Sequence, residues 1–593
     1  MTIRATRLIP TLIESLYMPF RSLFSLVALG PLTALFISGC QTAAPLPPAS
    51  FVQVLCINGR CGVVDQDGKQ RVPFENGYRA LFLSPDGRTA LVSNGAGWEL
   101  FDVASQSVTR KLPIDGDVKA LDDRDDSGER MDLVAFQRGG KWGLMDFEGK
   151  ERQAPQFDDV SMLGLGHSTI AYAIGDRWGL LNAKGQRVTE AVYLDYPLIM
   201  VSDDAGKETG LILASTGGQS WLIQLQDGQR HPVAFSDVNY VGDGHWEVSH
   251  GDGENRRAGL MDATGRLVID MKYRWLGNSG NGLIAFPTKG GELCGYLDYQ
   301  GQTVIAPQFS SCGPFGKRGA LAAEANSGEW GFIDRHGDWR EPPSYDFGGD
   351  SLTFSTVSSV ADDTMQNVSI RSTEEAMVRS TSQGLRTVAK FIGGEASTKQ
   401  RDALGRYMGR GDYSYGPVID HDPNGLVVAD VRSGIFDTDR GREVIPPTYR
   451  AINVLTHDRF VFADKPDPSL PNHAHLGVID ASAKVLIPPG EFYGFCANRS
   501  AHYLLAERYA DETQSLYDID GHLVVDTPYK ILSIDESRGI VRGYVRSDEL
   551  GGIYNLRGHQ VLSVVTMSCG AKQLRNGADQ PIWPINVESY CTD

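Results

Sequence analysis

The chain has 593 residues, of which 41% are hydrophobic and 22% are charged, and its formal net charge at pH 7 is −18. This composition is typical of a globular protein, with no low-complexity tract beyond a short tether near the amino terminus. The negative charge argues against a nucleic-acid-binding protein, which would need clustered basic residues.

The amino terminus has the pattern of an export signal. Arg4, Arg7 and Arg21 precede an apolar run over residues 23–37. A membrane-spanning helix needs roughly 20 apolar residues, so this shorter run is better interpreted as the core of a cleaved signal peptide.

The end of that run resembles the bacterial lipobox, because small residues Ser38 and Gly39 stand directly before Cys40. The resemblance implies cleavage before Cys40 and attachment of lipid to its thiol, and Gln41 implies sorting to the outer membrane. We therefore expect residues 1–39 to be removed and residues 40–50 to form a lipidated tether. The mature protein would face the periplasm, and its net charge would fall from −18 to −20, because three arginines and one glutamate are lost.

Seven cysteines remain after Cys40, and an oxidising envelope compartment permits disulfides between them. Cysteines that lie close together in the sequence suggest three disulfide pairs, although connectivity cannot be derived from sequence alone. Cys56–Cys61 could close a hairpin, Cys294–Cys312 could staple a repeat to the next loop, and Cys569–Cys591 could hold the carboxyl terminus. Cys496 is left over, either free and buried or exchanged into one of these pairs. No spacing resembles paired zinc ligands, so we predict neither a metal site nor a cofactor.

A short phrase recurs along the chain, and a fixed period of this kind indicates a repeat architecture. A short apolar segment follows a Trp-Gly pair, and the phrase ends at the glycine of a turn. The successive turn glycines are 36, 43, 37, 36 and 36 residues apart at Gly149, Gly185, Gly228, Gly265, Gly301 and Gly337. With weaker copies on either side, about twelve units cover most of the mature chain.

Each unit predicts a β-meander of three or four short strands. Apolar residues alternate after the Trp-Gly pair, and the glycine of the following turn accepts a positive φ. A second strand ends at a proline, and an aromatic residue then follows, as at Phe309 and Tyr449, and we expect it to pack on the next unit. An aspartate recurs before the turn, and we interpret it as a turn-stabilising side chain instead of a catalytic acid. This aspartate occurs at Asp146, Asp262, Asp298, Asp334, Asp437 and Asp480.

These units resemble the bacterial WG-repeat (KWG-repeat) family. The match is specific at Trp142-Gly143, Trp178-Gly179 and Trp330-Gly331, and other residues replace the tryptophan elsewhere. The resemblance implies a β-rich repeat array and no common activity. We expect the tryptophans to pack between neighbouring units, and the alternative is an exposed aromatic ladder that binds glycan.

The predicted fold is therefore all-β, built of tandem β-meander repeats of about 36 residues. Propeller-like closure is favoured over an open β-solenoid, since radial packing protects the strand edges. The repeats divide into residues 51–346 and 431–593. Residues 347–430 depart from the pattern, and two capping-box sequences predict a helical insertion near 373–410.

No catalytic motif is present, so the chain is not predicted to be an enzyme. The leading hypothesis is a lipid-anchored envelope protein whose repeat array serves as a binding or scaffold surface for another envelope protein. A glycan- or peptidoglycan-binding module is the alternative, followed by an envelope enzyme acting on glycans. The last would require two carboxylates close together in one cleft.

Overall fold

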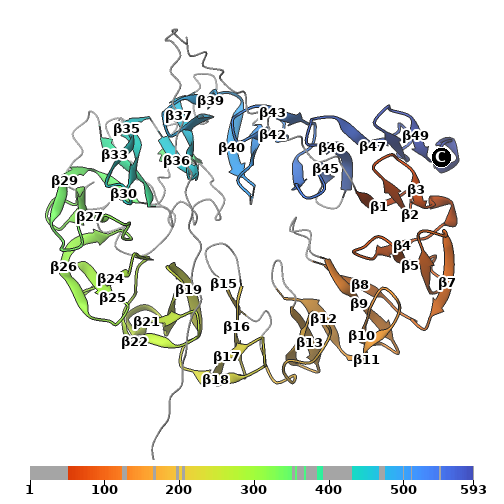
Figure 1. Cartoon of the computed structure of the whole chain (residues 1–593), viewed down its shortest axis with the longest axis horizontal. Coiled ribbons are helices and arrows are strands. Elements are labelled where there is room, and N and C mark those ends of the chain that lie inside the picture. Colours follow the sequence, from red (N-terminus) through yellow and green to blue (C-terminus); the bar gives the residue numbers. More distant parts are fainter. Residues whose placement is uncertain are drawn as a thin grey trace, which may run out of the picture. The chain divides into compact units, whose positions relative to one another are not determined.

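The strands of the chain form many small antiparallel sheets that follow the sequence order (Figure 1). The computed structural model describes residues 51–122, 130–163, 169–194, 199–202, 208–349, 354–356, 366–368, 384–391, 431–449, 451–466, 474–498, 500–508, 510–546 and 549–591. The predicted signal peptide, the tether and Cys40 lie outside these residues. Within them the all-β prediction is confirmed.

The first half of the described chain contains six sheets, each a meander of three or four strands. In chain order they are β1 (Val52–Ile57), β2 (Arg60–Asp65) and β3 (Gln70–Val72); β4 (Ala80–Leu83), β5 (Thr89–Ser93), β6 (Trp98–Asp102) and β7 (Ser107–Leu112); β8 (Val118–Asp122), β9 (Arg130–Arg138), β10 (Lys141–Met145) and β11 (Glu151–Phe157); β12 (Asp159–Met162), β13 (Thr169–Ile174) and β14 (Arg177–Asn182); β15 (Ile199–Ser202), β16 (Glu208–Ser215), β17 (Ser220–Gln224) and β18 (Arg230–Val233); and β19 (Asp237–Gly242), β20 (His245–His250), β21 (Arg257–Asp262) and β22 (Leu267–Tyr273).

The second half contains larger sheets, because a long strand can join two successive units. The seven-stranded sheet consists of β23 (Ser279–Gly280), β24 (Leu283–Pro287), β25 (Cys294–Asp298), β26 (Thr303–Cys312), β27 (Ala320–Glu324), β28 (Trp330–Ile333) and β29 (Trp339–Tyr345). It is followed by β30 (Phe347–Gly349), β33 (Leu385–Phe391), β34 (Val431–Asp437) and β35 (Arg442–Tyr449), with a separate hairpin β31 (Phe354–Thr356) and β32 (Gln366–Val368). The last sheets are β36 (Ala451–Thr456), β37 (Arg459–Pro466), β38 (Ala474–Asp480) and β39 (Val485–Ile487); β40 (Phe492–Ala497), β41 (Tyr503–Arg508), β42 (Gln514–Asp518) and β43 (Leu523–Asp526); and β44 (Ile531–Asp535), β45 (Ile540–Arg546), β46 (Glu549–Asn555), β47 (Gln560–Thr566), β48 (Lys572–Asn576) and β49 (Pro581–Trp583). Three short 3-10 helices, η1 (Phe74–Asn76), η2 (Gly253–Asn255) and η3 (Glu588–Tyr590), complete the described elements.

Apolar clusters join each sheet to its neighbours in the sequence. One cluster joins the β8–β11 sheet to the β12–β14 sheet through Trp142, Phe157 and Tyr172, and another joins β36–β39 to β40–β43 through Val478 and Phe495. One face of a sheet therefore packs on the preceding sheet and the other face on the following sheet. This explains why the central strands are buried on both faces and have nearly continuous apolar sequences.

The first and last sheets also share a cluster, although they lie at opposite ends of the sequence. Leu55 of the first sheet and Phe74 of η1, which follows that sheet, pack with Ile553, Leu574 and Trp583 of the last sheet. The side-chain amide nitrogen of Asn58 donates a hydrogen bond to the carbonyl oxygen of Lys572 over 2.8 Å. We call this interface between β1–β3 and β44–β49 the seam.

The helix predicted near residues 373–410 is wrong where the structure describes this segment. Leu385, Val388 and Ala389 have helical spacing in the sequence, but they lie on strand β33. All three are buried. A strand covered on both faces needs no alternation of apolar and polar residues, so a short apolar run cannot distinguish it from a helix. The rest of the predicted insertion lies outside the described residues.

The described strands of residues 347–430, which the sequence had suggested as an irregular region between two arrays, include two that belong to a repeat unit. Strands β30 and β33 come from this region and pair in one sheet with β34 and β35. The extra residues therefore lie in the two connections of a single unit, between β30 and β33 and between β33 and β34. These long connections separate strands that pair with one another and conceal the repeat in the sequence.

Candidate functional site

At Trp142-Gly143 and Trp330-Gly331 the signature occupies a central strand of its sheet, where the glycine fits against a bulge in the next strand. The pairing of β10 with β11 shifts register between Trp142 and Leu144. A Cβ atom on Gly143 would lie 2.7 Å from the carbonyl oxygen of Gln153 and 2.8 Å from the nitrogen of Pro155. Side-chain carbons do not approach backbone atoms this closely, so the bulge requires a glycine. The same register shift occurs beside Gly331 in β28.

The tryptophans of the signature pack between units. Trp142 and Trp330 are 5% and 7% exposed, and the half-buried Trp178 packs against the cluster around Tyr193 and Ile212. The expected inter-unit packing is confirmed, and the exposed aromatic ladder is wrong. None of the nine tryptophans, all of which are among the described residues, is classed as exposed.

The residues that replace tryptophan occupy the same buried position. Cys61, Ala258, Cys294, Ser433 and Leu476 are each at most 2% exposed. The position therefore requires a residue that can be buried in the unit, and residues of very different size occupy it. This explains why the signature is weak in sequence while the unit remains intact.

The aromatic residue that follows the proline also packs on the next unit, as expected. The ring centroids of Tyr449 at the end of β35 and Phe462 of β37 are 5.1 Å apart. Phe309 shares a buried cluster with Ala320 and Ala322 of the next unit. Trp142 pairs in register with Phe157 across the bulge, so signature and aromatic residue fill one interface together.

The recurring aspartates stabilise the turns. Oδ1 of Asp146 accepts hydrogen bonds from the backbone nitrogens of Glu148 and Lys150 at 3.1 and 2.8 Å, and Arg152 donates to its Oδ2 at 3.1 Å. Asp262, Asp298, Asp334, Asp437 and Asp480 make the same kind of turn contacts. The predicted structural role is confirmed.

Five further turns use the same device, and the sequence analysis missed them. Their side chains accept from the backbone nitrogens two and four residues later at Asp65, Asn182, Asp518, Asn555 and Asn576. An Asp or Asn three residues before the turn residue is the signal that would have found them. At Ala483 and Asp579 the usual turn glycine is absent, and φ is +63° and +60°.

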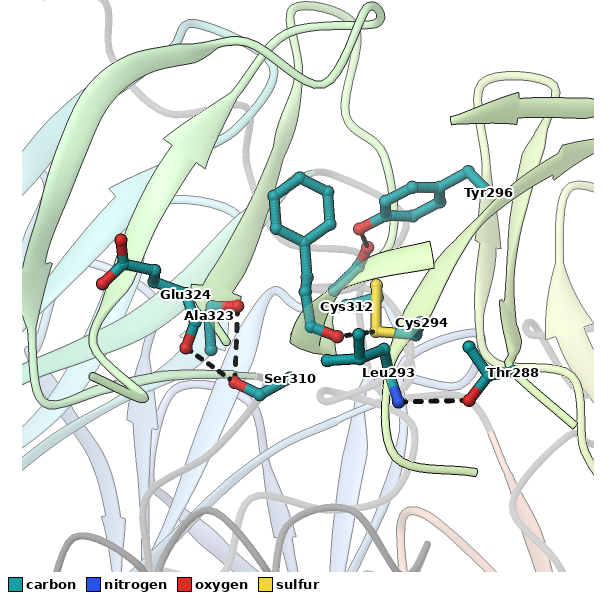
Figure 2. The surroundings of a disulfide bond; sticks show 10 residues. Thr288, Leu293, Cys294, Tyr296, Ser310, Cys312, Ala323 and Glu324 are labelled. Carbon is teal, nitrogen blue, oxygen red and sulfur yellow. Dashed lines mark hydrogen bonds between the residues drawn. A yellow bond between two sulfur atoms is a disulfide. The ribbon is translucent and has the colours of Figure 1, made fainter. Parts of the chain in front are cut away.

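The described part of the chain contains three disulfides, and they join the pairs that the sequence suggested: Cys56–Cys61, Cys294–Cys312 and Cys569–Cys591. Figure 2 shows Cys294–Cys312 linking β25 to the end of β26, close to Tyr296. The hydroxyl of Tyr296 donates to the carbonyl oxygen of Gly313 over 2.8 Å, which fixes the chain directly after this disulfide. Cys496 takes part in none of the three disulfides.

Two carboxylates lie near each other on the outer strands β29 and β35. The hydroxyl of Tyr345 donates to Oε1 of Glu443 over 2.6 Å. Burial, together with the negative charge of Glu443, raises the pKa of Glu341. Lys390 lies over the Tyr345 ring at 4.8 Å and opposes this shift. The raised pKa lets Glu341 hold a proton more readily than an isolated glutamate does. The two carboxylates lie on two different units and form no recognisable catalytic arrangement.

A bidentate ion pair elsewhere in the array joins strand β20 to the residue that follows η2. Arg256 donates to both carboxylate oxygens of Glu247 at 3.1 and 3.2 Å. Glu247 is 7% exposed and also accepts from the backbone nitrogen of Leu276. These bonds satisfy the buried carboxylate, so its role is structural.

Two absences concern only the residues that the structure describes. Among them, no three or more His, Cys, Asp or Glu side chains are placed to hold a metal ion together. In the same residues, no helix has the length and apolar character needed to span a bilayer.

The sequence profile of the WG-containing repeat family matches residues 259–286 and 295–326. The chain contains WG repeats. The matched stretches begin at Gly259 and Gly295, directly after Ala258 and Cys294. The WG profile therefore matches two units in which the tryptophan is replaced, because the glycine, the strands and the turn are retained.

No curated protein matches the chain. Among solved structures, it is similar to a eukaryotic initiation factor, with 9% identity and a TM-score of 0.29 over 75% of this chain and 94% of that chain. It is also similar to the tricorn protease, with 11% identity and a TM-score of 0.24 over 90% of this chain and 63% of that chain. It is similar as well to hydrazine synthase of Kuenenia stuttgartiensis, with 15% identity and a TM-score of 0.16 over 44% of this chain and 96% of that chain. Similarities at these TM-scores carry no argument about function.

Proposed function

We propose that this WG-repeat protein is a lipid-anchored binding or scaffold protein of the bacterial cell envelope. It would be held at the outer membrane through Cys40, face the periplasm and bind another envelope protein. The observation that carries the proposal is the repeated, rigid turn. At Asp146, Asp298 and Asp480, as in the other units named above, one side chain fixes the turn through two backbone hydrogen bonds.

The turn tips would form the contact surface. The residues between the fixed Asp and the turn residue vary from unit to unit, as in Tyr299-Gln300 and Arg335-His336. A turn whose backbone is already fixed loses little backbone freedom when a partner binds, which favours affinity. A row of such turns therefore supports recognition of an extended protein surface.

The outer strands are poorly suited to recruiting a partner by strand addition. They lie at the edges of their sheets and contain prolines, such as Pro155 in β11, Pro343 in β29 and Pro446 in β35. Proline lacks the backbone donor that an added strand would need, and edge prolines suppress sheet-to-sheet association. Binding through side chains of the turns agrees better with these edges.

We further propose that the sheets close into a propeller-like ring. The seam supports this, since Leu55 of the first sheet and Phe74 of η1 pack with Trp583 of the last sheet. Each intervening sheet packs on its sequence neighbours, so an open array would leave the two seam faces exposed. Small-angle X-ray scattering tests the closure: a maximum dimension equal to that of an extended row would contradict it.

Crosslinking and co-purification from outer membranes test the function. Native protein is compared with Cys40→Ser, which should move into the soluble fraction with its fold unchanged. A stoichiometric envelope protein crosslinked to the native form and lost with the anchor would support the scaffold role. Failure of Cys40→Ser to leave the membrane would contradict lipid anchoring.

A second experiment, peptidoglycan sedimentation, decides the glycan alternative. Its structural basis is weakened, because Trp142 and Trp330 are buried and cannot form the exposed ladder. Purified protein is incubated with insoluble peptidoglycan and sedimented. Retention on peptidoglycan without any crosslinked protein would replace the scaffold proposal with a glycan-binding one.

A further inference from the structure

The seam combines apolar packing with aromatic stacking. The rings of Phe74 and Trp583 stack with centroids 4.6 Å apart, and Tyr590 packs edge-on against Trp583 at 5.2 Å. Arg60 of the first sheet lies over the Tyr590 ring at 5.9 Å. The carboxyl-terminal segment thus contributes a ring to an interface with the opposite end of the chain.

Polar bonds fix the register of the seam. The side chain of Asn58 donates to the carbonyl oxygen of Lys572 and accepts from its backbone nitrogen, both over 2.8 Å. The Asn58 amide thereby makes the two backbone hydrogen bonds that a residue of a neighbouring β-strand would make. Arg542 is 9% exposed and donates to Oε1 of Gln53 over 3.1 Å. The seam contains a limited number of such bonds and no continuous strand pairing.

Two of the three disulfides hold the elements that form these contacts. Cys56 and Cys61 face each other across β1 and β2, so their bond closes the hairpin whose tip is Asn58-Gly59. Cys569 lies in the turn before β48, three residues before Lys572, and Cys591 follows Tyr590 directly. One disulfide therefore constrains the Asn58 side of the seam, and the other constrains both Lys572 and Tyr590.

The third disulfide lies in a different sheet, away from the seam. Cys294–Cys312 joins β25 and β26 within the seven-stranded sheet (Figure 2). Cys294 and Cys312 both belong to the apolar cluster of that sheet and not to the seam cluster. The chain therefore contains an internal control with the same chemistry at another location.

We propose that the seam is a redox latch: the first and last sheets stay joined while Cys56–Cys61 and Cys569–Cys591 are oxidised, and separate when both are reduced. The reason is that a disulfide restricts the number of conformations that the segment it closes can adopt when that segment is not folded. Without them, the hairpin tip and the carboxyl-terminal segment are ordered only by the pairing of their own strands and by the seam contacts. The remaining sheets are held by their own inter-sheet clusters and should stay folded. The latch would operate whatever the protein binds.

The chemistry is ordinary thiol–disulfide exchange. Reduction of each disulfide takes two electrons and two protons and gives two thiols. A dithiol supplies them and is itself oxidised to a cyclic disulfide. Closure is the reverse, in which a disulfide-containing oxidant accepts the electrons, as the oxidising envelope compartment allows.

Hydrogen–deuterium exchange of the full-length protein, read by mass spectrometry, tests the latch. Native protein is measured oxidised and after treatment with dithiothreitol. Peptides covering residues 52–64 and 572–583 should exchange at least about tenfold faster after reduction. Peptides covering β20 and β21 should keep their rates, because their sheet does not take part in the seam.

Paired substitutions identify the disulfides responsible. The variant with Cys56→Ala, Cys61→Ala, Cys569→Ala and Cys591→Ala should show fast seam exchange without reductant. The control with Cys294→Ala and Cys312→Ala should show native seam exchange while oxidised. Reductant added to native protein provides the same comparison if the quadruple variant does not fold.

Three results would overturn the latch. The first is equal seam exchange in oxidised and reduced native protein. The second is acceleration of β20 and β21 to the same extent as the seam, which would indicate global unfolding. The third is opening of the seam in the Cys294→Ala, Cys312→Ala control.

Discussion

Replacing the signature glycine tests how the WG repeat is built. In Gly143→Ala, the new Cβ would lie 2.7 Å from the carbonyl oxygen of Gln153 and 2.8 Å from the nitrogen of Pro155. Phe136 would also lie 3.0 Å away. Gly143 does not have a positive φ, so backbone conformation adds no penalty and the whole effect is steric.

The cost follows from which atoms must move. Two of the three close atoms belong to the backbone of β11. Backbone atoms cannot move aside by a change of rotamer, as a side chain could. Overpacking a filled interior costs about 1–3 kcal/mol, and we expect the upper end, about 3 kcal/mol, because backbone is displaced. Gly331→Ala should cost the same, since its Cβ would lie 2.7 Å from the carbonyl oxygen of Glu341 and 2.8 Å from the nitrogen of Pro343.

Urea denaturation followed by tryptophan fluorescence measures this difference in the free energy of unfolding. Gly218→Ala is the matched control, because nothing lies within 4 Å of its Cβ and its φ is not positive. The control should stay within about 0.5 kcal/mol of the native protein. The steric explanation is refuted if Gly143→Ala and Gly218→Ala are equally stable.

Three further predictions concern packing, turn strain and pH. Trp142→Ala should destabilise the protein by about 3–5 kcal/mol in urea denaturation, because it empties a site between two sheets; a loss under about 0.5 kcal/mol would indicate a surface role. Ala483→Gly should raise the stability by about 0.5–1 kcal/mol, since the alanine has a φ of +63°; an unchanged melting temperature would show that the turn tolerates alanine without strain. Burial works to raise the pKa of Asp535, but hydrogen bonds from Ser537 and Arg538 and the charges of Arg538 and Arg542 hold it below its usual value. Because the pKa of Asp535 is lower in the folded state, the ionised carboxylate stabilises the protein above about pH 4. This stabilisation is lost as the pH falls and the carboxylate is protonated. Asp535→Asn should therefore lower the melting temperature at pH 7 and have a smaller effect at pH 3, and an equal effect at both values would contradict the assignment.

The amino-acid sequence by itself determined the repeat unit. Alternating apolar residues, a turn glycine and an aspartate three residues before it predict two strands and their turn locally, as at Asp146 and Gly149. The burial of Trp142 and the packing of Tyr449 on the next unit also followed from the pattern. All of these depend on interactions within about 36 residues, the repeat period at Gly301 and Gly337, so the local sequence contains the information.

Only the tertiary structure decided which distant segments meet. Leu385 and Val388 form a strand because their sheet covers them on both faces, and this burial removes the alternation by which a strand is recognised. Asn58 and Lys572 are 514 residues apart, and no local pattern indicates that they bond. Such contacts depend on the summed geometry of all the intervening sheets, which no single repeat specifies.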